Sequence, residues 1–391
     1  MTPRSARSRS SAHASPRIAV LLLAALVAAC SGPRLSPWIE RPGPYDRLSP
    51  GQSERLGVAR ALLDQRDAIG AVRVLEAAQR RDPLQAGIAV CLQDARLAAV
   101  LRGDELDEVE TWRRANRPMD EDPPGELLWR WYDAIARERA EVVDRLMAAR
   151  LDPDTRASLR QLEVLSEDEP GCIWAHVGRA HTLLKLGRLT EARKALDVAL
   201  EMDPGHARTR RLEALVLARE GKDEYAVAAL ERWIEKTADD PLVGAGARDR
   251  AELDLAAALL EAERYSAARR RLDRLIGATQ FDDLDTQPRY QAFVLRAAAR
   301  EGGGDFVGAR EDAERARVED PARLLPWVQI AIIEEYRLGN PEAARAAWLR
   351  VEQLAVDAPD NDRIGAFLYG QRARVERARL EAVLGGAEVE P

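Results

Sequence analysis

Small and large apolar residues recur with a period of about 34 residues over most of the chain, and this repeat constrains the fold more than any other feature. The clearest copy, at 173–206, contains Ala180, Gly187, Ala192, Leu196, Ala199 and Pro204. The next copy, at 207–240, contains Ala214, Gly221, Ala226, Leu230 and Trp233. Apolar residues three and four positions apart lie on one face of a helix, Gly or a polar residue ends the first helix, and Pro ends the second. Each copy therefore predicts a helix–turn–helix hairpin.

Further copies occupy 290–323, the stretch through Gly339 to Pro359, a looser one around Ala256 to Leu275, and a first one at 52–85. The pattern closely resembles the tetratricopeptide repeat, and the resemblance covers six units between Gln52 and Pro359. It is most specific at 173–206, 207–240 and 290–323. The resemblance implies an all-α, right-handed solenoid of helix-turn-helix hairpins, with a concave surface that binds other proteins and carries out no catalysis.

The expected structure of the remaining segments depends on how well each one fits the 34-residue period. Residues 86–172 fit it poorly, although their length allows two to three hairpins, so degenerate helical repeats are expected there. The run Leu128 to Tyr132, followed by Ile135 and Val142-Val143, has the periodicity of a buried helix. Residues 173–359 hold the tetratricopeptide-like repeats, and 360–391 are expected to form a terminal capping helix and a disordered tail. An unrecognised catalytic insert in 86–172 remains the alternative for that segment.

The N-terminal residues have the pattern of an export signal. Residues 1–17 carry four arginines and no acid, and the apolar run 18–29 is too short to span a bilayer stably. Residues 1–29 are therefore expected to be a cleaved signal peptide. The stretch Leu26-Val-Ala-Ala-Cys30 resembles the bacterial lipobox, which implies a diacylglyceryl group and an N-terminal acyl chain such as palmitate on Cys30. An ordinary secreted protein with a chance cysteine is the alternative. Residues 30–51 are rich in proline and are expected to be a tether.

The residue after Cys30 is Ser31 rather than Asp. In the lipoprotein sorting rule of enteric bacteria this implies the outer membrane, so a lipid-anchored protein facing the periplasm of the bacterial cell envelope is expected. The mature chain is acidic, with 66 Asp and Glu against 59 Lys and Arg in the whole sequence, so membrane attachment would depend on the lipid rather than on basic charge.

The same acidic balance argues against a nucleic-acid partner. The sequence contains no Gly-rich phosphate loop, no metal-binding His or Cys motif and no Gly-x-Ser-x-Gly, so no enzyme, no metal, no small-molecule substrate and no cofactor beyond the lipid are expected. His176 and His181 lie five apart and do not share a face as zinc ligands would, and Asp282, Asp283 and Asp285 are expected to form a solvated loop. Whether Cys91 and Cys172 form a disulfide stays open.

The concave surface is the remaining candidate site. In the tetratricopeptide family it is lined mainly by the second, fifth, ninth, twelfth and thirteenth residues of each unit. Carried over copy by copy, these positions give the candidate groove residues Trp174, His181, Lys185, Arg208, Arg211, Arg219, Arg250, Gln291, Gln329, Tyr336 and Arg337. Arginines on one face can clamp carboxylates, so an acidic or C-terminal segment of an envelope protein is the expected partner. The opposing interpretation is that these arginines are solvated or paired with neighbouring Glu.

The sequence thus predicts a membrane-anchored scaffold or adaptor for protein–protein interaction in the cell envelope, in secretion, pilus, outer-membrane or cell-wall assembly. A self-assembling structural envelope protein, associating through an end repeat, is a further alternative.

Overall fold

The computed structural model describes residues 48–116, 123–238, 243, 245–279, 281–284, 286–356 and 363–384, with side chains in the last segment from Leu368 onward. The predicted signal peptide, Cys30, most of the predicted tether and the predicted disordered tail from Gly385 lie outside the described residues.

Within these ranges the chain forms α-helices, one short 3-10 turn and no strand. The helices of the N-terminal half are α2 (Pro50–Asp64), α3 (Ala68–Gln79), α4 (Ala86–Leu101), α5 (Asp107–Asn116), α6 (Pro124–Arg139), α7 (Val142–Leu151), α8 (Thr155–Asp168), α9 (Ile173–Lys185) and α10 (Leu189–Met202). Those of the C-terminal half are α11 (Ala207–Arg219), α12 (Asp223–Lys236), α13 (Ala245–Glu261), α14 (Tyr265–Ile276), α15 (Thr286–Gly302), α16 (Phe306–Glu319), α17 (Leu324–Tyr336), α18 (Pro341–Val356) and α19 (Arg363–Leu384), with η2 (Phe281–Asp283) before α15.

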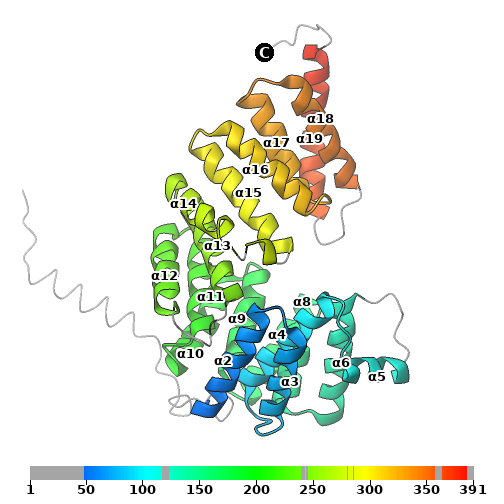
Figure 1. The fold of residues 1–391 in the computed structure, drawn as a ribbon, viewed down its shortest axis with the longest axis vertical. Coiled ribbons are helices and arrows are strands. Elements are labelled where there is room, and N and C mark those ends of the chain that lie inside the picture. The colour runs from blue at the N-terminus through cyan, green and yellow to red at the C-terminus, as the bar shows by residue number, and fades with distance from the viewer. Residues whose placement is uncertain are drawn as a thin grey trace, which may run out of the picture.

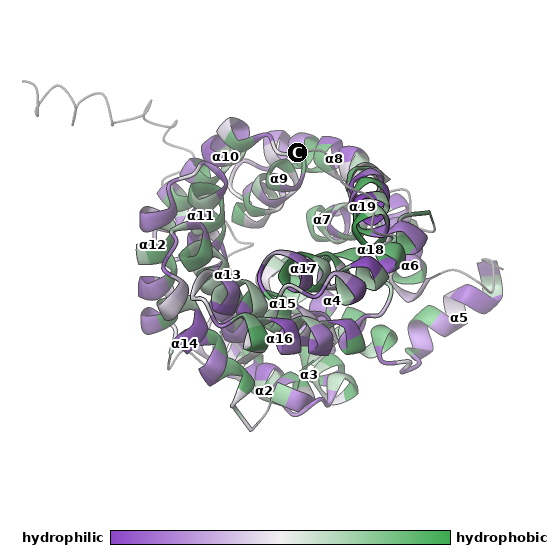
Figure 2. Cartoon of the chain, turned by 90° about the horizontal axis from the view of Figure 1, so that it is seen from above, coloured by the Kyte–Doolittle hydropathy of each residue, from purple (hydrophilic) through white to green (hydrophobic). Residues whose placement is uncertain are grey.

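The helices are arranged as a solenoid of antiparallel pairs that rises along the long axis of the molecule (Figure 1). Helices α7, α9, α11, α13 and α15 each contact the next odd-numbered helix as well as their own partner, and together with α17 they form a continuous inner row. Viewed down the axis, α7, α9 and α13 lie toward the centre, and α8, α10, α12 and α14 lie outside them (Figure 2). The all-α right-handed solenoid predicted from the repeats is confirmed.

Small residues let the paired helices approach closely. Ala192 and Ala199 of α10 are fully buried against α9, and Leu196 between them fills the adjoining space. The same arrangement recurs in α12, where Ala226 and Leu230 are buried. The alternation of alanine with a larger apolar residue therefore sets the spacing between the helices of each pair.

A left-handed residue ends the first helix of most pairs. Gly187 and Gly221 take φ values of 73° and 70° between α9 and α10 and between α11 and α12. Glycine has no Cβ to clash in this conformation, which explains why the repeat carries it there. Arg66 (φ 64°) and Glu263 (φ 56°) occupy the same place in the pairs α2–α3 and α13–α14, with the steric cost that glycine avoids.

The irregular segment 86–172 contains helices α4 to α8. Its periodicity between Leu128 and Val143 predicted one buried helix, but the structure divides it at Ala140, which takes a left-handed conformation with φ 55°. Helix α5 projects outward (Figure 1, Figure 2). Helix α4 contacts α2, α6 and α7, and α7 contacts α9, so the inner row continues through this segment.

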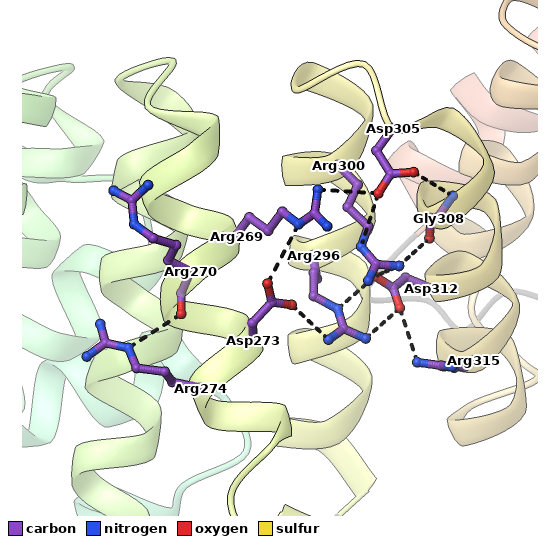
Figure 3. A network of polar contacts seen from close by, with 10 residues as sticks. All are labelled: Arg269, Arg270, Asp273, Arg274, Arg296, Arg300, Asp305, Gly308, Asp312 and Arg315. Carbon is purple, nitrogen blue, oxygen red and sulfur yellow. Dashed lines mark hydrogen bonds and ion pairs between the residues drawn. The ribbon is translucent and has the colours of Figure 1, made fainter.

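A network of ionic contacts joins α14, α15 and α16 (Figure 3). Arg296 of α15 contacts Asp273 of α14 and Asp312 of α16, whose carboxylate is fully buried. Arg300 of α15 also forms an ion pair with Asp312, at 3.1 Å. By contrast, Arg270 and Arg274 are exposed on α14 and point away from this network (Figure 3).

Among the described helices, none combines the length and apolarity needed to cross a membrane. The described residues likewise contain no group of three or more His, Cys, Asp or Glu side chains placed to hold a metal ion.

Candidate functional site

Successive helices of the inner row present ionisable side chains to one shared region. Five of these side chains are arginines, and we call them the inner arginine cluster: Arg60 of α2, Arg150 of α7, Arg208 and Arg211 of α11, and Arg250 of α13. Each interacts electrostatically with another member or with a group common to them. His181 and Lys185 of α9 lie beside the cluster.

Asp94 of α4 bridges two members of the cluster. Its Oδ1 accepts from Arg150 Nη2 at 3.1 Å, and its Oδ2 accepts from Arg208 Nη2 at 2.9 Å. Burial alone would raise the pKa of the Asp94 carboxyl, but the two guanidinium groups outweigh it and hold this pKa well below its usual range. The carboxylate is therefore charged at every pH at which the protein would function.

The guanidinium of Arg208 also packs on an aromatic ring. Its guanidinium carbon lies 5.4 Å from the centre of the Trp174 ring, a cation–π distance, and the edge of Trp174 packs on His206. Trp174, predicted as a groove residue, thus positions a second predicted groove residue.

Arg211 has its own carboxylate partner. Its Nε donates to Asp254 Oδ2 of α13 at 2.7 Å, which joins neighbouring helices of the inner row. Burial raises the pKa of Asp254, although Arg211 acts in the opposite direction.

The other two arginines have no carboxylate partner at ion-pair distance among the described residues. Arg60 Nη2 contacts the Sγ of Cys91 at 3.4 Å, and Arg250 Nε donates to the carbonyl of Gly246 at 3.0 Å. The pKa of Arg250 is lowered by burial and then by repulsion from Arg211, Arg208 and Arg60, which together outweigh the attraction of Asp94. The cluster therefore carries more positive charge than Asp94 and Asp254 neutralise.

The pKa of His181 is also affected by the positive charge of the cluster. Its side chain is open to solvent, yet the surrounding protein and the charges of Lys185 and Arg150, with Arg208 and Arg211, lower its pKa to about 4. The imidazole is consequently neutral at pH 7. Its chemistry there is hydrogen bonding, and the positive charge comes from the arginines and Lys185.

The remaining predicted groove residues lie elsewhere. Arg219 is exposed at the end of α11, about 16 Å along the helix axis from Arg208, with no described contact to the cluster. Four others are on α15 and α17 or just after it: Gln291 is exposed, Gln329 donates to Val294 O, the Tyr336 hydroxyl accepts from Arg379, and Arg337 pairs with Glu301. The structure thus groups Trp174, His181, Lys185, Arg208, Arg211 and Arg250, and separates the rest.

Four members of the region were missed from the sequence, and one of them, Asp254, holds none of the five inner places of its copy. Asp94 and Arg150 belong to 86–172, where no repeat register exists from which to assign inner positions. Arg60 occupies the ninth place of the copy at 52–85, the place that His181 has in the copy at 173–206. The register of the first copy therefore contained the signal for Arg60.

Residues predicted to have no special role are also placed. His176 is buried, with Nε2 3.1 Å from the carbonyl of Pro170. No disulfide joins Cys91 and Cys172. Asp282 is exposed after α14, and the side chains of Asp283 and Asp285 lie outside the described residues.

Comparison with known proteins agrees with this architecture. A family model described as tetratricopeptide repeat matches residues 177–241. No curated protein matches the chain.

Among solved structures, a chain of the APC/C hetero-tetramer Cut9–Hcn1 is similar to this protein. The match covers 78% of this chain and 59% of that chain, at 12% identity and a TM-score of 0.52. A tetratricopeptide repeat protein from Parabacteroides merdae covers 72% of this chain and 99% of its own at 15% identity and a TM-score of 0.44. The match to yeast Tom70 covers 89% of this chain and 70% of that chain, at 14% identity and a TM-score of 0.45. At these identities the likeness to Cut9–Hcn1 shows the fold alone.

Proposed function

Since the chain contains tetratricopeptide repeats and folds as their solenoid, we propose that it is a non-catalytic scaffold of the bacterial cell envelope whose inner arginine cluster binds an acidic segment of a partner protein. The acidic segment is a run of Asp and Glu or a C-terminal carboxylate. The protein is held at the outer membrane, facing the periplasm, by lipid on Cys30, and it acts without a metal, a further cofactor or a small-molecule substrate.

One observation carries the choice of partner chemistry, namely the excess of positive charge on the inner row of an otherwise acidic protein. An exposed arginine on a convex surface is screened by water and costs little. Arginines gathered on a concave face repel one another: Arg250 is exposed, yet desolvation by the surrounding protein, followed by repulsion from the neighbouring arginines, lowers its pKa. A ligand carboxylate would relieve this repulsion, so the binding free energy comes from neutralising the cluster.

The geometry of the cluster favours a carboxylate over other anion sites. Arg60 and Arg250 have guanidinium N–H donors with no carboxylate acceptor among the described residues, and a guanidinium can donate two parallel hydrogen bonds to one carboxylate. Lys185 supplies a further cation at the rim. An extended peptide with two or more acids can therefore contact these groups together.

The anchor rests on the sequence. The basic, apolar and small-residue elements before Cys30 occur in the order that lipidation requires, and two or three acyl chains exceed what stable attachment needs. Growth with labelled palmitate should label the wild-type protein and leave Cys30→Ser unlabelled. Equal labelling of both proteins would rule out Cys30 as the acceptor.

The binding proposal is tested by removing the arginines that lack carboxylate partners. We would compare the wild type with the double variant Arg60→Gln/Arg250→Gln. The control is Arg270→Gln/Arg274→Gln, which removes the same charge from exposed positions on α14 (Figure 3). Each would be crosslinked in the native envelope, and captured proteins identified by mass spectrometry.

A partner captured by the wild type and the control, but lost from the double variant, supports the proposal. The partner should carry an acidic stretch at the crosslinked position. The same partners captured by all three proteins would show that the inner arginine cluster is not the binding surface.

A further inference from the structure

Part of the inner arginine cluster is already occupied by a carboxylate of the chain itself. Asp94 gives one oxygen to Arg150 and the other to Arg208, so each guanidinium binds it through a single Nη2. This is the arrangement that a carboxylate of a bound peptide would adopt between the same two arginines. Asp94 and Arg208 are 114 positions apart in the sequence, and α7 and α9 separate their helices in the inner row.

The exposure of this ion pair differs from that of a structural one. The side chains of Arg208 and Asp94 retain 37% and 35% of their accessible surface. Those of Arg296 and Asp312, which join α15 to α16, retain 7% and 0%. The Asp94 side chain is therefore partly open to solvent, whereas Asp312 is enclosed.

Exchange of carboxylates at this place leaves both arginines paired. Asp94 can return to water through its exposed surface, while Arg150 and Arg208 keep an anionic partner throughout. Arg150 stays oriented because its Nη1 also donates to Gln93 Oε1 at 2.6 Å, and Arg208 stays oriented on the Trp174 ring. The two arginines are thus held in place independently of Asp94.

We infer that Asp94 is an internal competitor of the ligand: its carboxylate occupies Arg150 and Arg208 in the free protein, and a carboxylate of the incoming acidic segment displaces it. This inference rests on the proposed function, and it assigns a regulatory contact to the same site. The competition weakens the apparent affinity for the ligand, because only the molecules in which Asp94 has left the two arginines can bind it there. It also makes a segment with several acids bind better than an isolated carboxylate, since Arg60 and Arg250 bind the other acids.

The test uses the full chain purified in detergent and a fluorescein-labelled hexaglutamate peptide, with binding followed by fluorescence anisotropy at pH 8. Asp94→Asn should bind the peptide about tenfold more tightly than the wild type, because the competing charge is gone. Asp94→Glu restores a carboxylate and should return the Kd toward that of the wild type. Asp254→Asn is the matched control, since it removes one negative charge from the same region, and the Asp254 carboxylate hydrogen-bonds to one arginine, Arg211, rather than bridging two.

Tighter binding by Asp94→Asn, with Asp254→Asn within about twofold of the wild type, supports the inference. Equal gains in both variants would attribute the effect to net charge and overturn it. Unchanged or weaker binding by Asp94→Asn would also overturn it, because Asp94 would then support the site. If neither the wild type nor Asp94→Asn binds the peptide, the proposed function itself fails.

A second measurement needs no variant. Hydrogen exchange of the wild type with and without hexaglutamate should show faster exchange in α4, which loses its tie to α11, and slower exchange in α11, which gains the ligand. Slower or unchanged exchange in both helices would show that the peptide binds beside an intact Asp94–Arg208 pair, and would overturn the inference.

Discussion

Arg296 holds both carboxylate oxygens of the fully buried Asp312, through Nε at 2.8 Å and Nη2 at 2.7 Å. Arg300 adds a contact of 3.1 Å to the same carboxylate, and Arg296 reaches Asp273 of α14 at 3.1 Å. Three successive helices are thereby joined around one enclosed charge (Figure 3). Such a charge is tolerated in a protein interior only while its partners remain.

Removal of that carboxylate should destabilise the C-terminal half. Asp312→Ala leaves Arg296 buried without its main partner, and we expect a loss of about 3 kcal/mol in the free energy of unfolding. Urea unfolding followed by circular dichroism measures it. Glu191→Ala, which breaks the exposed pair with Arg188, is the control and should leave the midpoint unchanged. A loss below about 1 kcal/mol for Asp312→Ala would mean that the network contributes little.

The stability of the protein should fall in mild acid because of His206. The Nδ1 of this imidazole accepts the backbone N–H of Thr209 at the start of α11, a role that requires an unprotonated nitrogen, and burial lowers the pKa of His206 to about 4. The unfolded chain, with the ordinary pKa of 6.5, therefore binds more protons than the folded chain. This stability is present above pH 6.5 and is lost progressively as the pH falls toward 4.

His206→Asn keeps an acceptor at the start of α11 and removes the titration. Between pH 7 and pH 5 the variant should lose about 2 kcal/mol less stability than the wild type. Urea unfolding at the two pH values measures the difference. An identical loss in both proteins would assign the acid sensitivity to two other imidazoles, the buried His176 and the exposed His181, whose pKa values are also lowered.

Asp249 should show the opposite dependence. Burial, with repulsion from Asp64 and Glu252, raises its pKa to about 6. The folded chain then binds the proton more tightly than the unfolded chain, so the stabilising effect of protonation is fully present below pH 3.8 and is lost as the pH rises through 6. Asp249→Asn should raise the melting temperature at pH 8, and the difference from the wild type should vanish near pH 4. A constant difference across this range would contradict the assignment.

The turn between α13 and α14 should tolerate glycine better than its native residue. Glu263 has a φ of 56°, which glycine adopts without steric cost. We expect Glu263→Gly to leave stability unchanged or to raise it by up to about 1 kcal/mol, since the relief of strain outweighs the greater freedom of the unfolded chain. The reverse change, Gly187→Ala, should lower stability by about the same amount. Differential scanning calorimetry compares both with the wild type, and a destabilised Glu263→Gly would be the contrary result.

The period of the sequence predicted the hairpins, because helix faces and turn glycines are local properties that each copy repeats. Ala192, Leu196 and Gly187 have in the structure the roles that their spacing predicted. The division at Ala140 was not predicted, because alanine in a left-handed conformation carries no sequence signal and tertiary packing imposes it.

The candidate site was only partly accessible from the sequence. Repeat positions identify which residues face inward, and Arg208, Arg211 and Arg250 do share one region. Repeat positions do not predict which inner residues contact one another across the superhelix, because those contacts depend on the rotation from one helix pair to the next. Arg337 occupies an inner position by the same rule, yet it pairs with Glu301 far along the axis. Asp94 was missed because its segment has no register.

The Asp94–Arg208 pair also affects how the molecule unfolds. In a solenoid each pair of helices contacts only its neighbours, so the ends can unravel while the middle stays folded. A bond between α4 and α11 makes the intervening helices part of one closed loop of contacts. The segment from α4 to α11 should therefore open as a single cooperative unit, while the helices beyond it separate pair by pair.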